Sequence, residues 1–175
     1  MRYKTKRSGI VFLILAILWS FVIWSFSAKS AASSTVDSDA AASAINSMLE
    51  TFFGGEFDIN TNLIRKLAHF CEFAVLGFFA FMAFYFLGYK EYTKLLAYPV
   101  IWGFSVAVTD EFLQLFFEGR SAQVTDVLLD VSGTLTSVLI LLSITFFTTY
   151  GVSSFPPFAM AVSEVSCLIT ETLKR

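Results

Sequence analysis

The chain has 175 residues, of which 56% are hydrophobic and only 15% are charged, and its mean hydropathy is +0.70. A soluble domain needs far more polar surface than this, so the composition indicates a membrane protein. The formal net charge is −2, and the sequence contains no internal repeat, nucleotide-binding loop or basic patch of the kind that binds nucleic acid.

Four stretches predict membrane-spanning helices. A span needs about 20 mostly apolar residues. The first stretch is almost free of charge, whereas the third and fourth qualify only if protein shields their charged residues from lipid. We therefore expect an all-α membrane protein, a small bundle of four transmembrane helices. The expected spans are about residues 9–28, 65–87, 95–117 and 127–149.

The first span has one alternative, a cleaved signal peptide, because a basic start precedes it and Ser and Ala residues follow it. Its apolar core runs from Ile10 to Phe26, which is longer than the usual signal-peptide core of about 7–15 residues. We therefore favour an uncleaved anchor.

The distribution of charge predicts the orientation. Basic residues near span ends stay on the cytoplasmic side. They gather before the first span and between the second and third, whereas residues 30–62 carry acids and no Lys or Arg. We expect a multi-pass protein of the cell membrane, with both termini in the cytoplasm and an outer loop at 29–64. The basic residues are Arg2, Lys4, Lys6, Arg7, Lys90 and Lys94, followed at the C-terminus by Lys174 and Arg175.

Two further helices are expected outside the spans. Residues 30–44 predict a mobile stretch or a weak helix start, and from Ala41 apolar residues recur at helical spacing until Gly54 and Gly55. This pattern predicts a short extracytoplasmic amphipathic helix on the outer membrane surface. Its apolar positions are Ile45, Met48, Leu49, Phe52 and Phe53.

The transmembrane domain is expected to end near residue 150. Pro156 and Pro157 stop a helix from running straight on. Beyond them, apolar residues recur on one side, so residues 151–175 predict a cytoplasmic amphipathic tail with a C-terminal interfacial helix. A fifth span is the alternative.

Ionisable residues inside the predicted spans gather toward one end of the bundle. A charge at membrane depth is costly and usually faces a bundle interior, a partner or a cavity. A helix rises about 1.5 Å per residue, so residues 65–72, 110–114 and 126–130 lie at similar depth below the outer surface. Residues three and four apart share a helix face, and each span therefore presents one polar stripe. The stripes are Arg65, His69 and Glu72; Asp110 and Gln114; and Asp126, Asp130 and the small Gly133, which would let a neighbouring helix approach.

The expected site carries more acid than base. Its basic residues are Arg65, Lys66 and Arg120, and its acids exceed them by two. Such an excess cannot stay dry and unpaired, so a carboxyl holds a proton, a cation binds, or water enters. The acids are Glu72, Asp110, Glu111, Asp126 and Asp130.

The side-chain chemistry suggests candidate roles. A His or Glu can move a proton, basic residues can hold an anionic head group, and carboxylates can bind a divalent cation. The alternative is structural: ion pairs from Arg65 and Arg120 only hold the bundle, and His69 only hydrogen-bonds to Glu72. Candidate catalytic residues are His69, Glu72, Asp110 and Glu111; candidate substrate-binding residues are Arg65, Lys66, Gln114, Arg120, Asp126 and Asp130; candidate metal ligands are Glu72, Asp110, Glu111 and Asp126.

Three of these segments resemble the VanZ-like family of membrane proteins. Residues 65–73 resemble its basic-x-x-His-x-x-Glu-aromatic segment, and residues 110–120 resemble its Asp-Glu-x-x-Gln-x-Phe…Gly-Arg signature. Residues 126–133 resemble its Asp-(apolar)-x-x-Asn-x-x-Gly continuation, with Asp130 where Asn is common. The resemblance covers most of the chain before the tail.

The resemblance implies an association with resistance to the glycopeptide antibiotic teicoplanin, and it implies no particular reaction. Two hypotheses follow. The chain is either a membrane enzyme whose site opens to the outer leaflet and acts on an anionic, lipid-linked cell-wall precursor, or a non-catalytic envelope protein. In the second case the same residues bind a lipid or the glycopeptide, or only hold the fold.

Overall fold

The computed structural model describes residues 2–28, 31–55 and 60–150, and within these ranges all regular structure is helical. The helices are α1 (Arg2–Ser27), α2 (Ala31–Phe53), α3 (Thr61–Leu87), α4 (Tyr92–Gln114) and α5 (Val124–Tyr150). The chain divides into two compact units, Met1–Val138 and Leu139–Arg175. The first unit contains every candidate site residue. The predicted tail at 151–175 lies outside the described residues.

Three helical segments are long and apolar enough to cross a membrane: Lys6–Ser27, Thr61–Leu87 and Val124–Thr149. They coincide with the first, second and fourth predicted spans, so the chain is a multi-pass membrane protein. α4 is not among these segments, and its sequence includes two adjacent acids, Asp110 and Glu111, near its end. The third span stays a prediction.

Local sequence signals begin and end these helices. The side chain of Asn60 accepts a hydrogen bond from the Asn62 N–H at 2.8 Å and so caps the start of α3. α3 ends at Gly88, whose φ of 105° is a left-handed conformation that favours glycine. Gly54, with a φ of 69°, follows the end of α2, as predicted.

α2 is longer than predicted, because it begins at Ala31 and not at Ala41. Of the two alternatives predicted for residues 30–44, the helix start is therefore confirmed and the mobile stretch is wrong. Two features favour the earlier start. Alanine, which is frequent in this segment, has the highest helix propensity. The Ser38 hydroxyl donates to a carbonyl of the preceding helical turn at 2.9 Å, and so it does not draw the backbone into a non-helical conformation. The Thr61 hydroxyl donates to Asp39 at 2.8 Å and links α3 to α2. A position of α2 on the membrane surface stays a prediction.

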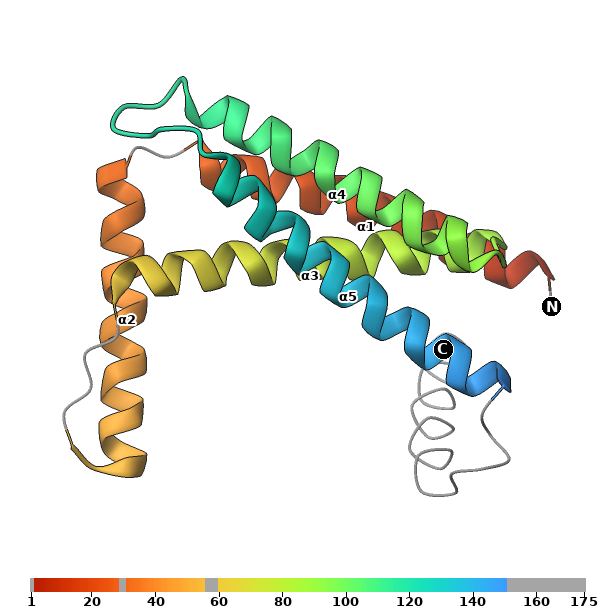
Figure 1. Cartoon of the computed structure of the whole chain (residues 1–175), viewed down its shortest axis with the longest axis horizontal. Coiled ribbons are helices and arrows are strands. Elements are labelled where there is room, and N and C mark those ends of the chain that lie inside the picture. Colours follow the sequence, from red (N-terminus) through yellow and green to blue (C-terminus); the bar gives the residue numbers. More distant parts are fainter. Residues whose placement is uncertain (1, 29–30, 56–59, 151–175) are drawn as a thin grey trace. The chain divides into compact units, whose positions relative to one another are not determined.

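Within the first unit, α1 lies beside α3 and α4 (Figure 1). The indole N–H of Trp19 on α1 donates to the Glu72 carbonyl on α3 at 2.9 Å. The indole N–H of Trp102 on α4 donates to the Ser20 hydroxyl on α1 at 3.2 Å. These bonds set the register of three helices, so that α1 and α4 end at the same level at which α3 begins.

The start of α5 packs tightly against α3 and α4 because glycines remove the side chains between them. A Cβ on Gly133 would overlap the carbonyl oxygen of Phe70, and one on Gly77 would lie 2.7 Å from the carbonyl oxygen of Thr134. A Cβ on Gly103 would overlap the side chain of Thr134, whose hydroxyl donates to a carbonyl of α3 at 3.2 Å. The predicted close approach at Gly133 is confirmed.

We expect Gly133→Ala to lower the free energy of unfolding by about 1–3 kcal/mol, because an added methyl group cannot fit without moving α3. Leu128→Phe, an enlargement at an exposed position of the same helix, is the matched control. Thermal unfolding of the purified protein in detergent, followed by circular dichroism, measures both variants. Equal stability of Gly133→Ala and wild type would contradict the packing described above.

Candidate functional site

The candidate site lies at the end of the first unit where α1 and α4 finish and α3 and α5 begin. A tight turn joins α4 to α5 there. The Arg120 N–H donates to the Phe117 carbonyl at 3.2 Å, and Gly119 takes a φ of 76°. This turn brings Arg120 back toward α4, and Asp126 follows in the first turn of α5.

Three helices bring an imidazole and two carboxyl groups together. They are His69 of α3, Asp110 of α4 and Asp130 of α5, and one nitrogen or oxygen atom from each lies within 4.8 Å of the others. Asp110 is 0% exposed and Asp130 is 1% exposed. His69 Nδ1 lies 3.8 Å from Asp130 Oδ1, which is too long for a hydrogen bond. The structural alternative required a hydrogen bond between His69 and Glu72, and this bond is not formed among the described residues.

Several polar atoms of this group have no hydrogen-bond partner within the described parts of the chain. They are His69 Nδ1, Asp110 Oδ1 and both carboxylate oxygens of Asp130. Burying a polar atom without a partner is costly, and native proteins rarely leave such atoms unsatisfied. Four such atoms in one group therefore mark a place where a further interaction is needed.

The remaining oxygen of Asp110 is held by a short chain of hydrogen bonds. Gln114 Nε2 donates to Asp110 Oδ2 at 3.1 Å, and Arg120 Nη1 donates to Gln114 Oε1 at 3.5 Å. Glu111, the next acid along α4, accepts the backbone N–H of Gln123 at 2.8 Å. Gln114 thus stands between the buried acid and the guanidinium, and Glu111 fixes the end of the α4–α5 turn.

A polar cavity of about 320 Å³ adjoins the buried group. It contains most of the predicted site residues, namely Arg65, Lys66, His69, Glu111, Gln114, Arg120, Asp126 and Asp130. Sequence reasoning missed its other lining residues, which are Asn62, Gly119, Ser121, Gln123 and Leu129. Asn62 could have been found, because it precedes Arg65 by three positions on the same helix face. The residues of the α4–α5 turn could not be found in this way, because they lie outside any helix and follow no helical spacing.

Two predicted residues, Glu72 and Asp110, do not line the cavity. Asp110 is one residue removed from the cavity, because it accepts a hydrogen bond from Gln114, which lines the cavity. Glu72 is half-buried, and its carbonyl oxygen accepts the Trp19 N–H at the contact between α3 and α1. Of the candidate metal ligands, Asp110 belongs to the group with His69 and Asp130, whereas Glu72, Glu111 and Asp126 stand outside it.

The cavity lining brings together three basic residues, Arg65, Lys66 and Arg120, and three acids, Glu111, Asp126 and Asp130. Partial burial, followed by the like charge of Arg65, lowers the pKa of Arg120 from its usual value, and the charges of Asp110 and Glu111 oppose this shift. Within the described ranges, no ion pair joins Arg65 or Lys66 to the acids of the site. The predicted ion pairs from Arg65 are therefore not formed there.

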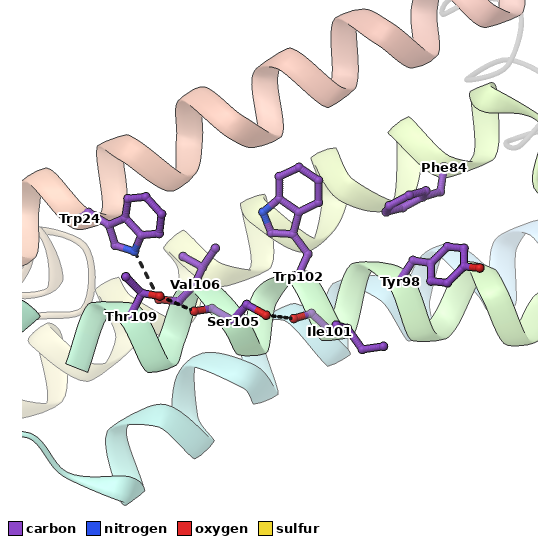
Figure 2. Close-up of a pocket in the computed structure, with 8 residues that line it drawn as sticks. All are labelled: Trp24, Phe84, Tyr98, Ile101, Trp102, Ser105, Val106 and Thr109. Atoms are coloured by element: carbon purple, nitrogen blue, oxygen red, sulfur yellow. Dashed lines mark hydrogen bonds between the residues drawn. The ribbon is translucent and has the colours of Figure 1, made fainter. Parts of the chain in front are cut away.

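A second pocket, of about 550 Å³, lies between α1, α3 and α4 (Figure 2). The indole of Trp24 extends toward α4 and donates to the Val106 carbonyl at 3.3 Å, as Figure 2 shows. The hydroxyls of Ser105 and Thr109 turn back to their own helix, each at 2.8 Å. Its lining residues include no acid, lysine, arginine or histidine, so this pocket suits apolar chains and not charged head groups.

Comparisons with known proteins were made against families, curated proteins and solved structures. The family described as VanZ/LLP1 matches residues 12–147. No curated protein matches the chain, and no solved structure does. The matched region runs from within α1 almost to the end of α5 and includes every residue of the candidate site. Since it covers most of the sequence, the chain belongs to the VanZ/LLP1 family.

Proposed function

We propose that the polar cavity binds the anionic, phosphate-bearing head group of a membrane lipid or lipid-linked cell-wall precursor. The observation that carries this proposal is the lining of the cavity by Arg65, Lys66 and Arg120. Guanidinium groups bind phosphate oxygens in pairs, and ammonium groups bind them as point charges. The cavity lies among helices that cross the membrane, so a lipid can present its head group while its chains stay in the bilayer.

The electrostatics of the lining support an anionic ligand. Arg65 and Arg120 lie close enough for their like charges to disfavour each other, and Arg120 is partly buried. An anion between the two guanidinium groups would compensate both charges. Gln114 already holds the Arg120 side chain on one side, which reduces the entropy lost when the ligand binds.

The proposed site faces the outer leaflet. Lys90 and Lys94 lie at the opposite end of α3 and α4 from the cavity, and basic residues near span ends stay in the cytoplasm. The acids of α2 follow the other end of α1. Both termini then lie in the cytoplasm if α4 crosses the membrane. This orientation gives the cavity access to cell-envelope precursors exposed on the outer surface.

A chemical step can follow binding, because His69 lines the same cavity as the basic residues. In the absence of a bound metal ion, an imidazole beside a bound phosphate group is suited to transfer a proton. Binding alone also suffices to withhold a precursor or to alter wall assembly. Either route supports the proposed role in lowering sensitivity to teicoplanin, with the bound lipid or the glycopeptide itself as partner.

We expect Arg120→Gln and Arg65→Gln each to weaken the binding of anionic lipid about tenfold, the effect of roughly 1.4 kcal/mol. Native mass spectrometry of the purified protein with phosphatidylglycerol and phosphatidylcholine measures this binding. The matched control is Lys90→Gln, which removes the same charge from an exposed position at the other end of the bundle. The proposal fails if all variants retain phosphatidylglycerol equally, or if the control loses as much as the site variants.

The orientation has a separate test in a background with Cys71→Ser and Cys167→Ser. We expect a membrane-impermeable maleimide to label Glu118→Cys in intact cells, because Glu118 is exposed in the α4–α5 turn. Lys90→Cys, in the connection before α4, should be labelled only after the membrane is permeabilised. Labelling of both positions from one side would show that α4 does not cross the membrane.

The association with antibiotic resistance predicts a phenotype. Expression of the chain in a teicoplanin-sensitive host should raise the inhibitory concentration of teicoplanin, and His69→Ala and Arg120→Gln should abolish the increase. Membrane levels of each variant, compared by immunoblot, separate loss of function from loss of protein. No increase with the wild-type chain at normal expression would exclude this role in that host.

A further inference from the structure

We propose that His69, Asp110 and Asp130 form a binding site for a divalent transition-metal ion of the zinc type. The three side chains come from α3, α4 and α5 and converge from different directions on one point inside the first unit. One potential ligand atom from each lies within 4.8 Å of the other two. This group differs from the acids that the sequence suggested as metal ligands, of which only Asp110 takes part.

The two carboxyl groups need a positive charge between them. Both are almost completely buried, at 0% exposed for Asp110 and 1% for Asp130. Asp110 Oδ1 and both oxygens of Asp130 have no hydrogen-bond partner in the described portion of the chain. Two carboxylates repel each other strongly in a low-dielectric interior, and a dication bound to both would replace this repulsion with attraction.

The basic residues of the cavity do not supply that charge directly. Gln114 lies between Arg120 and Asp110, with its amide nitrogen 3.1 Å from Asp110 Oδ2 and its oxygen 3.5 Å from the Arg120 guanidinium. Gln114 therefore orients one oxygen of Asp110 and leaves Oδ1 for the metal. Hydrogen bonds of this kind fix the direction of metal ligands in many sites.

The donor set selects the class of metal. Mg²⁺ and Ca²⁺ prefer oxygen ligands, whereas an imidazole nitrogen together with carboxylates suits Zn²⁺ and other transition-metal ions. Bonds of about 2.0–2.2 Å require ligand atoms roughly 3–3.5 Å apart. His69 Nδ1 and Asp130 Oδ1 are 3.8 Å apart, and the ligand atoms of all three residues lie within 4.8 Å of one another, so metal binding requires the three side chains to close toward the ion.

The site also has room for a further ligand. Zinc sites with three protein ligands commonly keep an open position for water or substrate. His69 and Asp130 line the polar cavity, and the open position of the metal would face that cavity. The metal site does not depend on the head-group proposal, since it rests on an imidazole and two buried carboxyl groups and not on the basic residues of the cavity.

The test uses the full-length protein, purified in detergent, stripped of lipid and treated with EDTA. Titration with Zn²⁺ by calorimetry should show one bound ion per chain, and Co²⁺ should give visible absorption bands of a coordinated ion. We expect His69→Gln and Asp130→Asn to weaken Zn²⁺ binding more than tenfold, since even loss of an outer-shell partner costs about 10–100-fold. Glu118→Gln, at an exposed position of the α4–α5 turn that belongs neither to the cavity lining nor to the group, should bind Zn²⁺ like wild type.

Circular dichroism and gel filtration confirm that each variant is folded. Zn²⁺ should raise the melting temperature of the EDTA-treated wild type and of Glu118→Gln, but not that of Asp130→Asn. The wild-type melting shift and Co²⁺ spectrum decide the question even if a variant does not fold. Absence of binding to wild type, unchanged binding in His69→Gln and Asp130→Asn, or equal loss in Glu118→Gln would each overturn the proposal. None of these outcomes bears on lipid binding, because lipid is absent from the test.

Discussion

The structure depends on enclosing acidic side chains within a bundle of largely apolar helices. A charged or strongly polar group cannot face hydrocarbon, so it must be surrounded by protein or reach a water-filled space. Asp110 and Asp130 belong to helices with large exposed apolar surfaces, yet both are buried where α3, α4 and α5 meet. Sealing these two carboxyl groups requires the helices to approach closely at this level.

Glycine and tryptophan residues achieve this approach in different ways. Gly77 and Gly103 lie against Thr134, and Gly133 lies against the backbone of α3 at Phe70, so the three helices pack closely without intervening side chains. Trp19 and Trp102 bond across helix contacts and fix how far α1 is shifted along its neighbours. Small residues bring helices together in membranes, where apolar burial gives little net driving force. Most candidate site residues are thereby held on regular helices, and Arg120 lies in the α4–α5 turn.

The site has two charge zones that share residues. The cavity lining holds three basic residues among its acids, and the buried carboxyl groups of Asp110 and Asp130 lie beside it and within it. His69 and Asp130 belong to both zones. An anion in the cavity and a cation at the buried group would each lower the electrostatic cost of binding the other, so the two proposed ligands should bind with positive coupling.

Much of the fold and most of the cavity could be predicted because the signals are local. Apolar length predicted the three helical segments that are long and apolar enough to cross a membrane, and helical spacing placed Arg65 with His69 and Asp126 with Asp130 on shared faces. Reading Gly133 as a point of close approach was also correct. The start of α2 was misjudged, because its Ala- and Ser-rich sequence lacks the apolar periodicity that marks most helices.

The sequence by itself determined that this protein is helical, crosses the membrane and carries its polar residues toward one end of the bundle. These properties follow from composition and from the geometry of a single helix. Only the tertiary structure decided that Asp110 faces His69 and Asp130, and that Glu72 lies outside both the cavity and this group. The physical reason is that the rotation of each helix about its axis is set by packing against its neighbours, and no single segment encodes that packing.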